Sequence, residues 1–123
     1  MNMKRLLTIF LSVAAMSVGL LFTPSSGYSQ SDDMAEKSRR AKELMAEGKF
    51  ADAVPVYRDL NTAVPNNPGL MLNLGMALHL AGEERQSLIP LGSAVKLDPN
   101  LAPAWLFLGA ARLQLGHTPA AVD

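Results

Sequence analysis

Few residues in this sequence could do chemistry, and they do not form a recognisable site. The two histidines, His79 and His117, have no cysteine to join them, because the chain contains none. Zinc and related metals need sets of histidine, cysteine and carboxylate ligands, and no such set is apparent. Ser25, Ser26 and Ser87 have no organised histidine and acid around them that would make a nucleophile. We therefore expect no metal, no cofactor and no enzymatic activity.

The charged residues are typical of a solvated surface. Lysine plus arginine and aspartate plus glutamate number 11 each, so the formal net charge is zero. A nucleic-acid partner would need a basic stripe and is not expected. The acidic pairs at 32–33 and 83–84 and the basic cluster at 37–42 should lie in water. The sequence contains no glycine-rich phosphate-binding loop. Gly75 and Gly109 are expected to let neighbouring helices pack closely.

The first 29 residues have the layout of a secretory signal peptide. Lys4 and Arg5 precede an uncharged apolar stretch at 6–22, and small or polar residues follow it. Cleavage after Gly27 or Ser29 fits the preference for small residues before the cut. The alternative is an uncleaved anchor, because 17 apolar residues reach the lower limit for crossing a bilayer. We expect the rest of the chain to be periplasmic or secreted, or membrane-anchored and facing outside the cytoplasm.

The remainder of the chain repeats itself every 34 residues. Gly48, Gly82 and Gly116 share this spacing. Other residues fall into columns of the same period: Ala41, Gly75 and Gly109; Ala53, Ser87 and Ala121; Tyr57 and Leu91; Pro65 and Pro99. Such a period indicates stacked two-helix units. In each unit, small residues should let the helices approach, the glycine of the first column should end the first helix with positive φ, and the proline should end the second.

The repeat predicts where the helices lie. After a polar linker at 30–33, we expect helices near residues 33–47, 50–64, 70–81, 85–97 and 103–115, and the start of another at Pro119. Pro55 and Pro90 fall inside the second helix of their units, where a proline costs about 3 kcal/mol. We expect these helices either to begin late or to kink on their outer face.

The third unit carries a specific resemblance. Trp105, Leu108 and Gly109 match the Trp-x-x-Leu-Gly pattern of tetratricopeptide repeats (TPRs), and Leu74 and Gly75 match its end in the second unit. The chain thus resembles a TPR protein from residue 34 to residue 123. This implies an all-α fold, an α-solenoid of antiparallel helix pairs preceded by the apolar signal helix. Its units would be 34–67, 68–101 and a partial third unit at 102–123.

The resemblance also implies a binding surface, because the first helix of each TPR unit lines a concave face that contacts ligands. The residues it indicates are Lys42, Met45, Leu72, Asn73, Met76, His79, Leu106, Ala110 and Leu113. Some TPRs clamp the carboxylate at a peptide's end with paired lysine, arginine and asparagine residues. Only Asn73 matches that clamp, so we do not expect carboxylate recognition.

The stretch at 70–81 contains no lysine, arginine, aspartate or glutamate. It could form an adaptable apolar groove with Met71 and Met76, because methionine packs against varied shapes. Such a groove would take an amphipathic helix or an apolar peptide. The alternative, which we favour, is that this helix is apolar because it is the buried centre of the stack.

The expected function is that of a non-catalytic scaffold that binds a protein or peptide outside the cytoplasm. Alternatives are the N-terminal part of a larger exported TPR protein whose activity lies downstream, and a membrane-tethered assembly factor. Asp123 falls within the third unit, which leaves the helix at 103–115 without its full cover. A continuation of the chain, a second copy or a partner could cover it, and we favour continuation.

Overall fold

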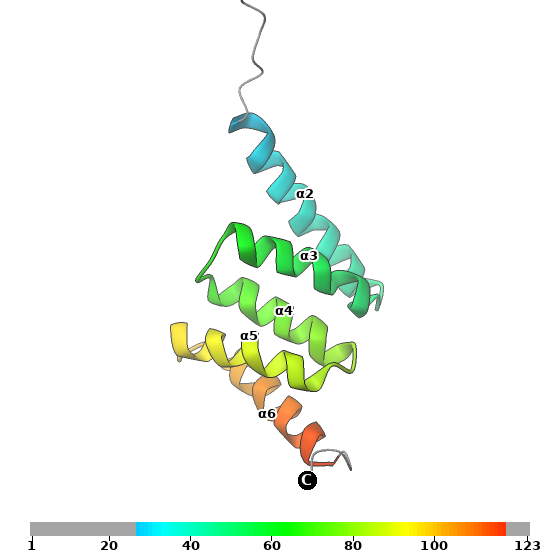
Figure 1. Cartoon of the computed structure of the whole chain (residues 1–123), viewed down its shortest axis with the longest axis vertical. Helices are drawn as coiled ribbons and strands as arrows, with labels where there is room; N and C mark the ends of the chain where they lie inside the picture. The colour runs from blue at the N-terminus through cyan, green and yellow to red at the C-terminus, as the bar shows by residue number, and fades with distance from the viewer. Residues whose placement is uncertain (1–26, 118–123) are drawn as a thin grey trace, which may run out of the picture. The chain divides into compact units, whose positions relative to one another are not determined.

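The computed structural model describes residues 27–117, and within them the chain is all-helical, without strands (Figure 1). The helices are α2 (Gly27–Ala46), α3 (Phe50–Ala63), α4 (Pro68–Leu80), α5 (Glu84–Leu97) and α6 (Ala102–Gly116). By its contacts the chain divides into two compact units, Met1–Gln30 and Ser31–Asp123. Helices α3 to α6 lie wholly in the second unit. The predicted signal helix and the predicted start of a helix at Pro119 lie outside the described residues.

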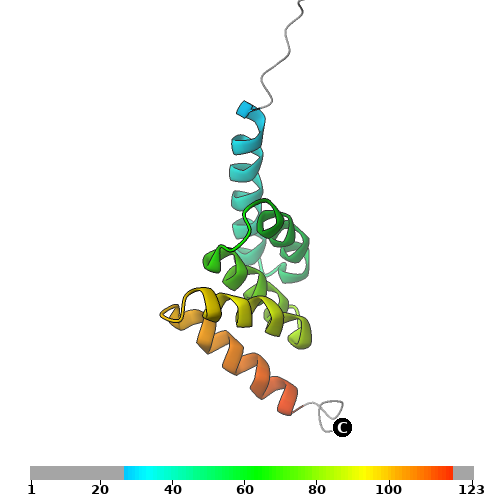
Figure 2. The ribbon, with the colours of Figure 1, turned by 60° about the vertical axis from the view of Figure 1, so that its left-hand side comes forward.

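Successive helices run in opposite directions and stack in chain order (Figures 1 and 2). Helix α4 packs against α3, α5 and α6, and α5 packs against both α4 and α6. The first helices of the repeats, α2, α4 and α6, are termed the A helices, and α3 and α5 the B helices. Direct packing of α4 on α6 means that neighbouring A helices form one layer of the stack.

Glycines end the first two A helices as the sequence predicts. Gly48 and Gly82 have φ of 74° and 82°, values that favour glycine. At each turn the amide three residues past the helix reaches back five residues, from Lys49 to the Leu44 carbonyl and from Glu83 to the Leu78 carbonyl, both at 2.8 Å. This pattern satisfies carbonyls that the helix end leaves free.

The third glycine of that column behaves differently. Gly116 was expected to end its helix in the same left-handed conformation, but it is the last residue of α6 and its φ is not positive. Helix α6 starts at the same repeat position as α4 but extends two positions further. The amide of His117 still bonds to the carbonyls of Leu113 and Gln114. The helix therefore ends at Gly116 as predicted, whereas the predicted positive φ is wrong.

The start of the first helix also differs from the expected one. Helix α2 begins at Gly27 rather than near residue 33, so the segment 30–33 expected as a linker is helical. Ion pairs between side chains three or four residues apart lie on the exposed surface of this helix and stabilise it. Asp33 Oδ2 lies 3.2 Å from Lys37 Nζ, and Arg39 contacts both Glu36 and Glu43. Pairs three or four residues apart stabilise an exposed helix by a few tenths of a kcal/mol each, about 0.2–0.5.

The two internal prolines are accommodated within full-length helices. Helix α3 begins at Phe50 and α5 at Glu84, so neither helix starts late. Pro55 is exposed, as expected for the outer face, whereas Pro90 is buried. The outer-face expectation fails for Pro90, which lies on the buried side of α5.

Two hydrophobic clusters hold the stack together, and α4 contributes to both. The first joins α2, α3 and α4, and includes Ala41, Leu44, Tyr57, Leu60 and Leu78. The second joins α4, α5 and α6 and consists of Leu72, Leu91, Ala94, Val95, Ala104 and Leu108. The apolar stretch at 70–81 is thus largely explained by burial at the centre of the stack, the interpretation that we favoured from sequence.

Candidate protein-binding surface

On α4, the residues indicated by the sequence divide into buried and partly open positions. Leu72 is 8% exposed and belongs to the second hydrophobic cluster. Asn73, Met76 and His79 are partly buried, and Met76 packs against the same cluster. Beside them Leu80, which the repeat register also places at a ligand-facing position of this helix, is 42% exposed. The exposed large apolar side chain of α4 therefore lies at its C-terminal end.

His79 is held by residues from two other helices. Its Nδ1 atom lies 2.6 Å from Glu84 Oε2 at the start of α5, and its ring meets Phe107 of α6 edge-on at 5.8 Å. The side chains of His79 and Glu84 are only 19% and 12% exposed. Glu84 was expected to be solvated with Glu83, and this is wrong for Glu84 because the turn at Gly82 brings it back over α4. The pair ties α4 to α5.

The indicated residues on α6 are the most open of the set. Leu106 is 70% exposed and Leu113 64% exposed, while Ala110 is partly buried. In the first turn of α6, Trp105 is half exposed, and its Nε1 donates to the Pro99 carbonyl at 2.8 Å. Large apolar side chains exposed together on one helix are a common mark of an interaction surface.

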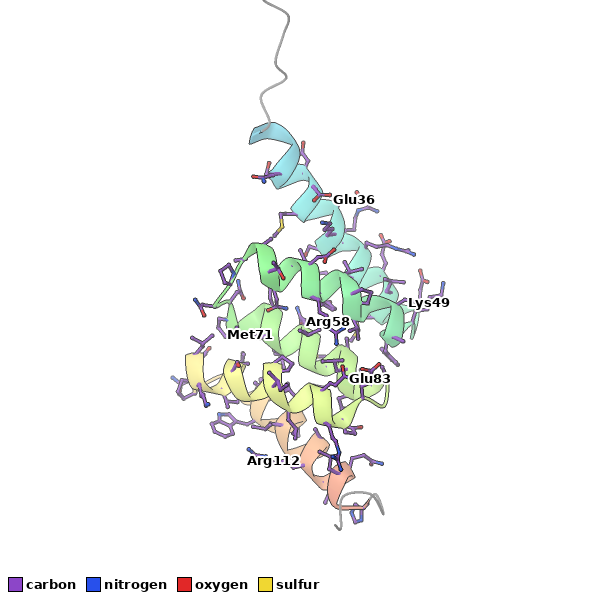
Figure 3. The ribbon with its side chains drawn as sticks, viewed as in Figure 1. Glu36, Lys49, Arg58, Met71, Glu83 and Arg112 are labelled. Carbon is purple, nitrogen blue, oxygen red and sulfur yellow. The ribbon has the colours of Figure 1, made fainter. Side chains whose placement is uncertain are left out.

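The indicated residues on α2 lie in a different setting. Lys42 is exposed, and Met45 is partly buried against the first hydrophobic cluster. Charges crowd this helix, where Lys37 also approaches Asp59 of α3 at 3.9 Å. By contrast, α4 contains no lysine, arginine, aspartate or glutamate, and α6 contains only Arg112, which is labelled in Figure 3. The open surface thus changes from charged on α2 to apolar on α4 and α6.

The geometry matches solved structures of repeat domains. The crystal structure of the Sgt2 TPR domain from Aspergillus fumigatus has a TM-score of 0.64 and 23% identity, covering 68% of this chain and 56% of that chain. The structure of the TPR2B domain of yeast Sti1 in complex with pHsp70 has a TM-score of 0.64 and 19% identity, covering 72% of this chain and 70% of that chain. The chain has a tetratricopeptide repeat fold. Neither a protein-family model nor a curated protein matches the sequence.

Within the TPR fold, two glycines of one repeat column have opposite surroundings. Gly75 on α4 is buried, and a Cβ built there would overlap the side chain of Leu91 on α5. Gly109, at the same place on α6, is exposed, and a Cβ there would meet no atom within 4 Å. Both glycines were expected to pack helices, which is right for Gly75 and wrong for Gly109 in the described part of the chain.

The B helices carry polar contacts that join the TPR units. Arg58 Nη2 on α3 donates to Gln86 Oε1 on α5 at 3.0 Å, a contact between successive B helices (Figure 3). Asn61 Nδ2 donates to the carbonyls of Tyr57 and Leu70, which fixes the end of α3 to the start of α4. At that start, Asn67 Oδ1 accepts from the Leu70 amide at 3.0 Å and caps α4. The contacts that Asn61 and Asn67 make with Leu70 position the start of the A helix α4.

Other kinds of site find little support among residues 27–117. No group of three or more histidine, cysteine, aspartate or glutamate side chains there is arranged to hold a metal ion. None of the helices in this range is both long and apolar enough to cross a bilayer. A hollow of about 300 Å³ at the α4–α5 turn is lined by Gly82, Glu83, Glu84, Arg85, Gln86 and Leu115, a set without a nucleophile and its base.

Proposed function

We propose that this TPR domain is a non-catalytic interaction module that binds an apolar peptide or an amphipathic helix along its A helices. The observation that carries the proposal is the open, almost uncharged surface of α4 and α6. Leu80, Leu106 and Leu113 are each more than 40% exposed and stand at A-helix positions. Burying such side chains contributes about 25 cal/mol per Å² of apolar area, so an apolar partner is the one this surface favours.

The class of partner has independent support. The Sti1 TPR2B domain, which has the same fold, is in complex with pHsp70 in its solved structure. That likeness supports a peptide or protein as the partner. The chemistry proposed here differs from charge recognition, because the A-helix positions of α6 that would hold a carboxylate are occupied by Pro103 and Phe107.

A peptide-binding experiment tests this function. The probes are an apolar amphipathic 16-residue helix, a scrambled version of it, and an acidic peptide with a free C-terminal carboxylate. Trp105 is the only tryptophan of the chain and lies on α6, so its fluorescence reports binding. We expect the amphipathic helix to bind, and Leu80→Glu to weaken that binding about tenfold or more.

The control for this experiment is Ile89→Glu. Ile89 is 75% exposed on the B helix α5, so the variant adds the same charge on a comparably open apolar residue away from the A helices. It should bind as the unchanged chain does. Equal binding of the scrambled peptide, or preference for the acidic peptide, would contradict an apolar groove.

We also propose that the domain acts outside the cytoplasm. The support is the layout of residues 1–29, with Lys4 and Arg5 ahead of an uncharged apolar stretch. The periplasm or the extracellular space would be its location after cleavage, and the outer side of the membrane if the segment stays attached. Mass spectrometry of the exported product distinguishes these cases, since a product that retains Met1 rules out cleavage.

Two further functions remain proposals of the same kind. The chain could be the N-terminal part of a larger exported TPR protein whose activity lies downstream, or a membrane-tethered assembly factor. The first is favoured by the open side of α6 at Gly109. Sequencing the transcript beyond the codon for Asp123 tests it, because further TPR codons in frame would be expected.

A further inference from the structure

His79 is the one polar residue in an apolar column of the repeat. The positions 34 residues before and after it hold Met45 and Leu113. Glu84, which His79 contacts, takes the place that Phe50 holds in the first unit. Because the first unit forms its two helices with apolar residues at both positions, the repeat fold does not require a polar pair there. The pair is therefore a feature of the second unit and not of the repeat.

Glu84 fixes the position of the proton on the His79 ring. His79 Nδ1 lies 2.6 Å from Glu84 Oε2. An ionised carboxylate can only accept a hydrogen bond, so Nδ1 carries a proton and donates it. In a neutral imidazole the other ring nitrogen is then an acceptor. The contact with Glu84 thus sets the tautomer of the ring and leaves a lone pair on Nε2.

The Nε2 atom of His79 is accessible to solvent. In the described part of the chain, Asn61 Oδ1 is the one buried side-chain nitrogen or oxygen that lacks a hydrogen-bond partner. His79 Nε2 has no partner among the described residues either and is not among the buried atoms, so solvent reaches it. The side chain as a whole is only 19% exposed, and Phe107 of α6 packs against its ring. A mostly covered ring with one accessible acceptor admits only a small donor group.

The neighbours of His79 along α4 are apolar. Met76, three residues before it, packs against the second hydrophobic cluster, and Leu80, the next residue, is 42% exposed. A partner that covers these side chains also removes water from Nε2 of His79. An acceptor that loses water without gaining a donor weakens binding, whereas a matching donor restores the lost hydrogen bond. The His79 acceptor therefore distinguishes between apolar partners that carry a donor and those that do not.

We propose that His79 selects partners that carry a serine or threonine hydroxyl on their apolar face, and that Glu84 positions His79 for this contact. The inference rests on the proposed function, since it concerns the same surface. A hydroxyl suits Nε2 because it is a donor on a short side chain. A lysine would also donate, but its charge would lose water beside Leu80 and Phe107 at a much greater cost.

Peptide pairs that differ by one hydroxyl test the proposal. The parent is an amphipathic 16-residue helix with valine at each apolar position, and in each variant one valine becomes threonine, which has nearly the same shape. Trp105 fluorescence reports binding at about pH 8.5, two units above the ordinary pKa of histidine. At one peptide position, threonine should bind about tenfold more tightly than valine. At the other positions it should bind more weakly, because its hydroxyl is covered without a partner.

Three variants of the chain assign the preference to its residues. His79→Phe keeps a ring and removes the acceptor, so threonine should lose its advantage. Glu84→Gln removes the carboxylate, so the ring can adopt either tautomer and the preference should fall several-fold. Glu83→Gln is the matched control, because it makes the same change at an exposed neighbour and should keep the preference. The measured quantity is a ratio of two affinities, which a general loss of stability does not change, and circular dichroism checks that each variant is folded.

The outcomes separate this inference from the proposed function. A chain that binds none of the peptides overturns both. A chain that binds the amphipathic helix but favours threonine at no position overturns the hydroxyl preference alone. A threonine preference that persists in His79→Phe also overturns it, because another acceptor would then be responsible. A preference that Glu84→Gln leaves unchanged overturns the positioning role of Glu84.

Discussion

Leu91 of α5 fills the space above Gly75 of α4, so closely that a Cβ on Gly75 would overlap the Leu91 side chain. Leu91 is fully buried and belongs to the second hydrophobic cluster, so it cannot move aside freely. The missing side chain at Gly75 is therefore what allows α4 and α5 to approach. Gly109 occupies the same repeat position on α6 without any such neighbour.

Alanine at these two glycines should have opposite effects on stability. Gly75→Ala should destabilise the fold by about 1–3 kcal/mol, because it overpacks the α4–α5 interface. Gly109→Ala should stabilise it by about 0.5–1 kcal/mol, because alanine favours a helix and the added methyl meets nothing. Urea unfolding followed by circular dichroism at low protein concentration measures both. Changes of the same sign would show that the two positions share one environment after all.

Much of this fold is predictable from the sequence because the repeat fixes helix positions. The spacing of Gly48, Gly82 and the turn prolines places α3 to α6 close to their observed bounds. The spacing could not reveal the difference between Gly75 and Gly109. A column of identical residues predicts only similar local geometry, whereas burial depends on which helix lies on top.

The contact between His79 and Glu84 should contribute measurably to stability. Their side chains are mostly buried and their atoms lie 2.6 Å apart, so a double-mutant cycle with His79→Gln and Glu84→Gln should give a coupling of about 0.5–1.5 kcal/mol. Thermal unfolding at constant pH measures it. Arg39 and Glu36, also 2.6 Å apart but more than 60% exposed, provide the comparison. Their coupling should be much smaller because both side chains are solvated, and equal couplings would contradict the role of burial.

The candidate surface was predicted less completely than the fold. The repeat register places both Leu72 and Leu80 at ligand-facing positions of α4, yet Leu72 lies in the core and Leu80 is open. Register alone cannot separate them, because neighbouring A helices cover part of each other. Glu84 was missed for a related reason, since its approach to His79 depends on the direction of the chain after Gly82.

A glutamate in place of Leu72 should impair folding, whereas a glutamate in place of Leu80 should leave the fold intact and impair only peptide binding. Leu72→Glu buries a carboxylate among Leu91, Val95 and Leu108 and should cost about 4 kcal/mol or more. Leu80→Glu replaces a side chain that is 42% exposed and should change stability by less than about 0.5 kcal/mol. Chemical unfolding of both variants checks this. A large loss of stability at Leu80 would mean that its variant cannot be used to test peptide binding.

Alkaline pH should destabilise the domain through Tyr57. This side chain is 4% exposed, and its burial raises the pKa of the phenol above its ordinary value of 10.0. The unfolded chain therefore loses the phenolic proton at a lower pH than the folded chain does. The stabilisation is fully present below about pH 10 and is lost as pH rises through the folded-state pKa.

Tyr57→Phe isolates this effect, because it keeps the buried ring and removes the titrating hydroxyl. The variant should lose less thermal stability than the unchanged chain between about pH 9 and pH 11, while lysines and other surface groups titrate equally in both. Melting temperatures followed by circular dichroism at fixed ionic strength measure the difference. Parallel melting curves for the two chains across this range would mean that Tyr57 ionises in the folded state as easily as in the unfolded one. That result would contradict the tight packing of α2, α3 and α4 around its ring.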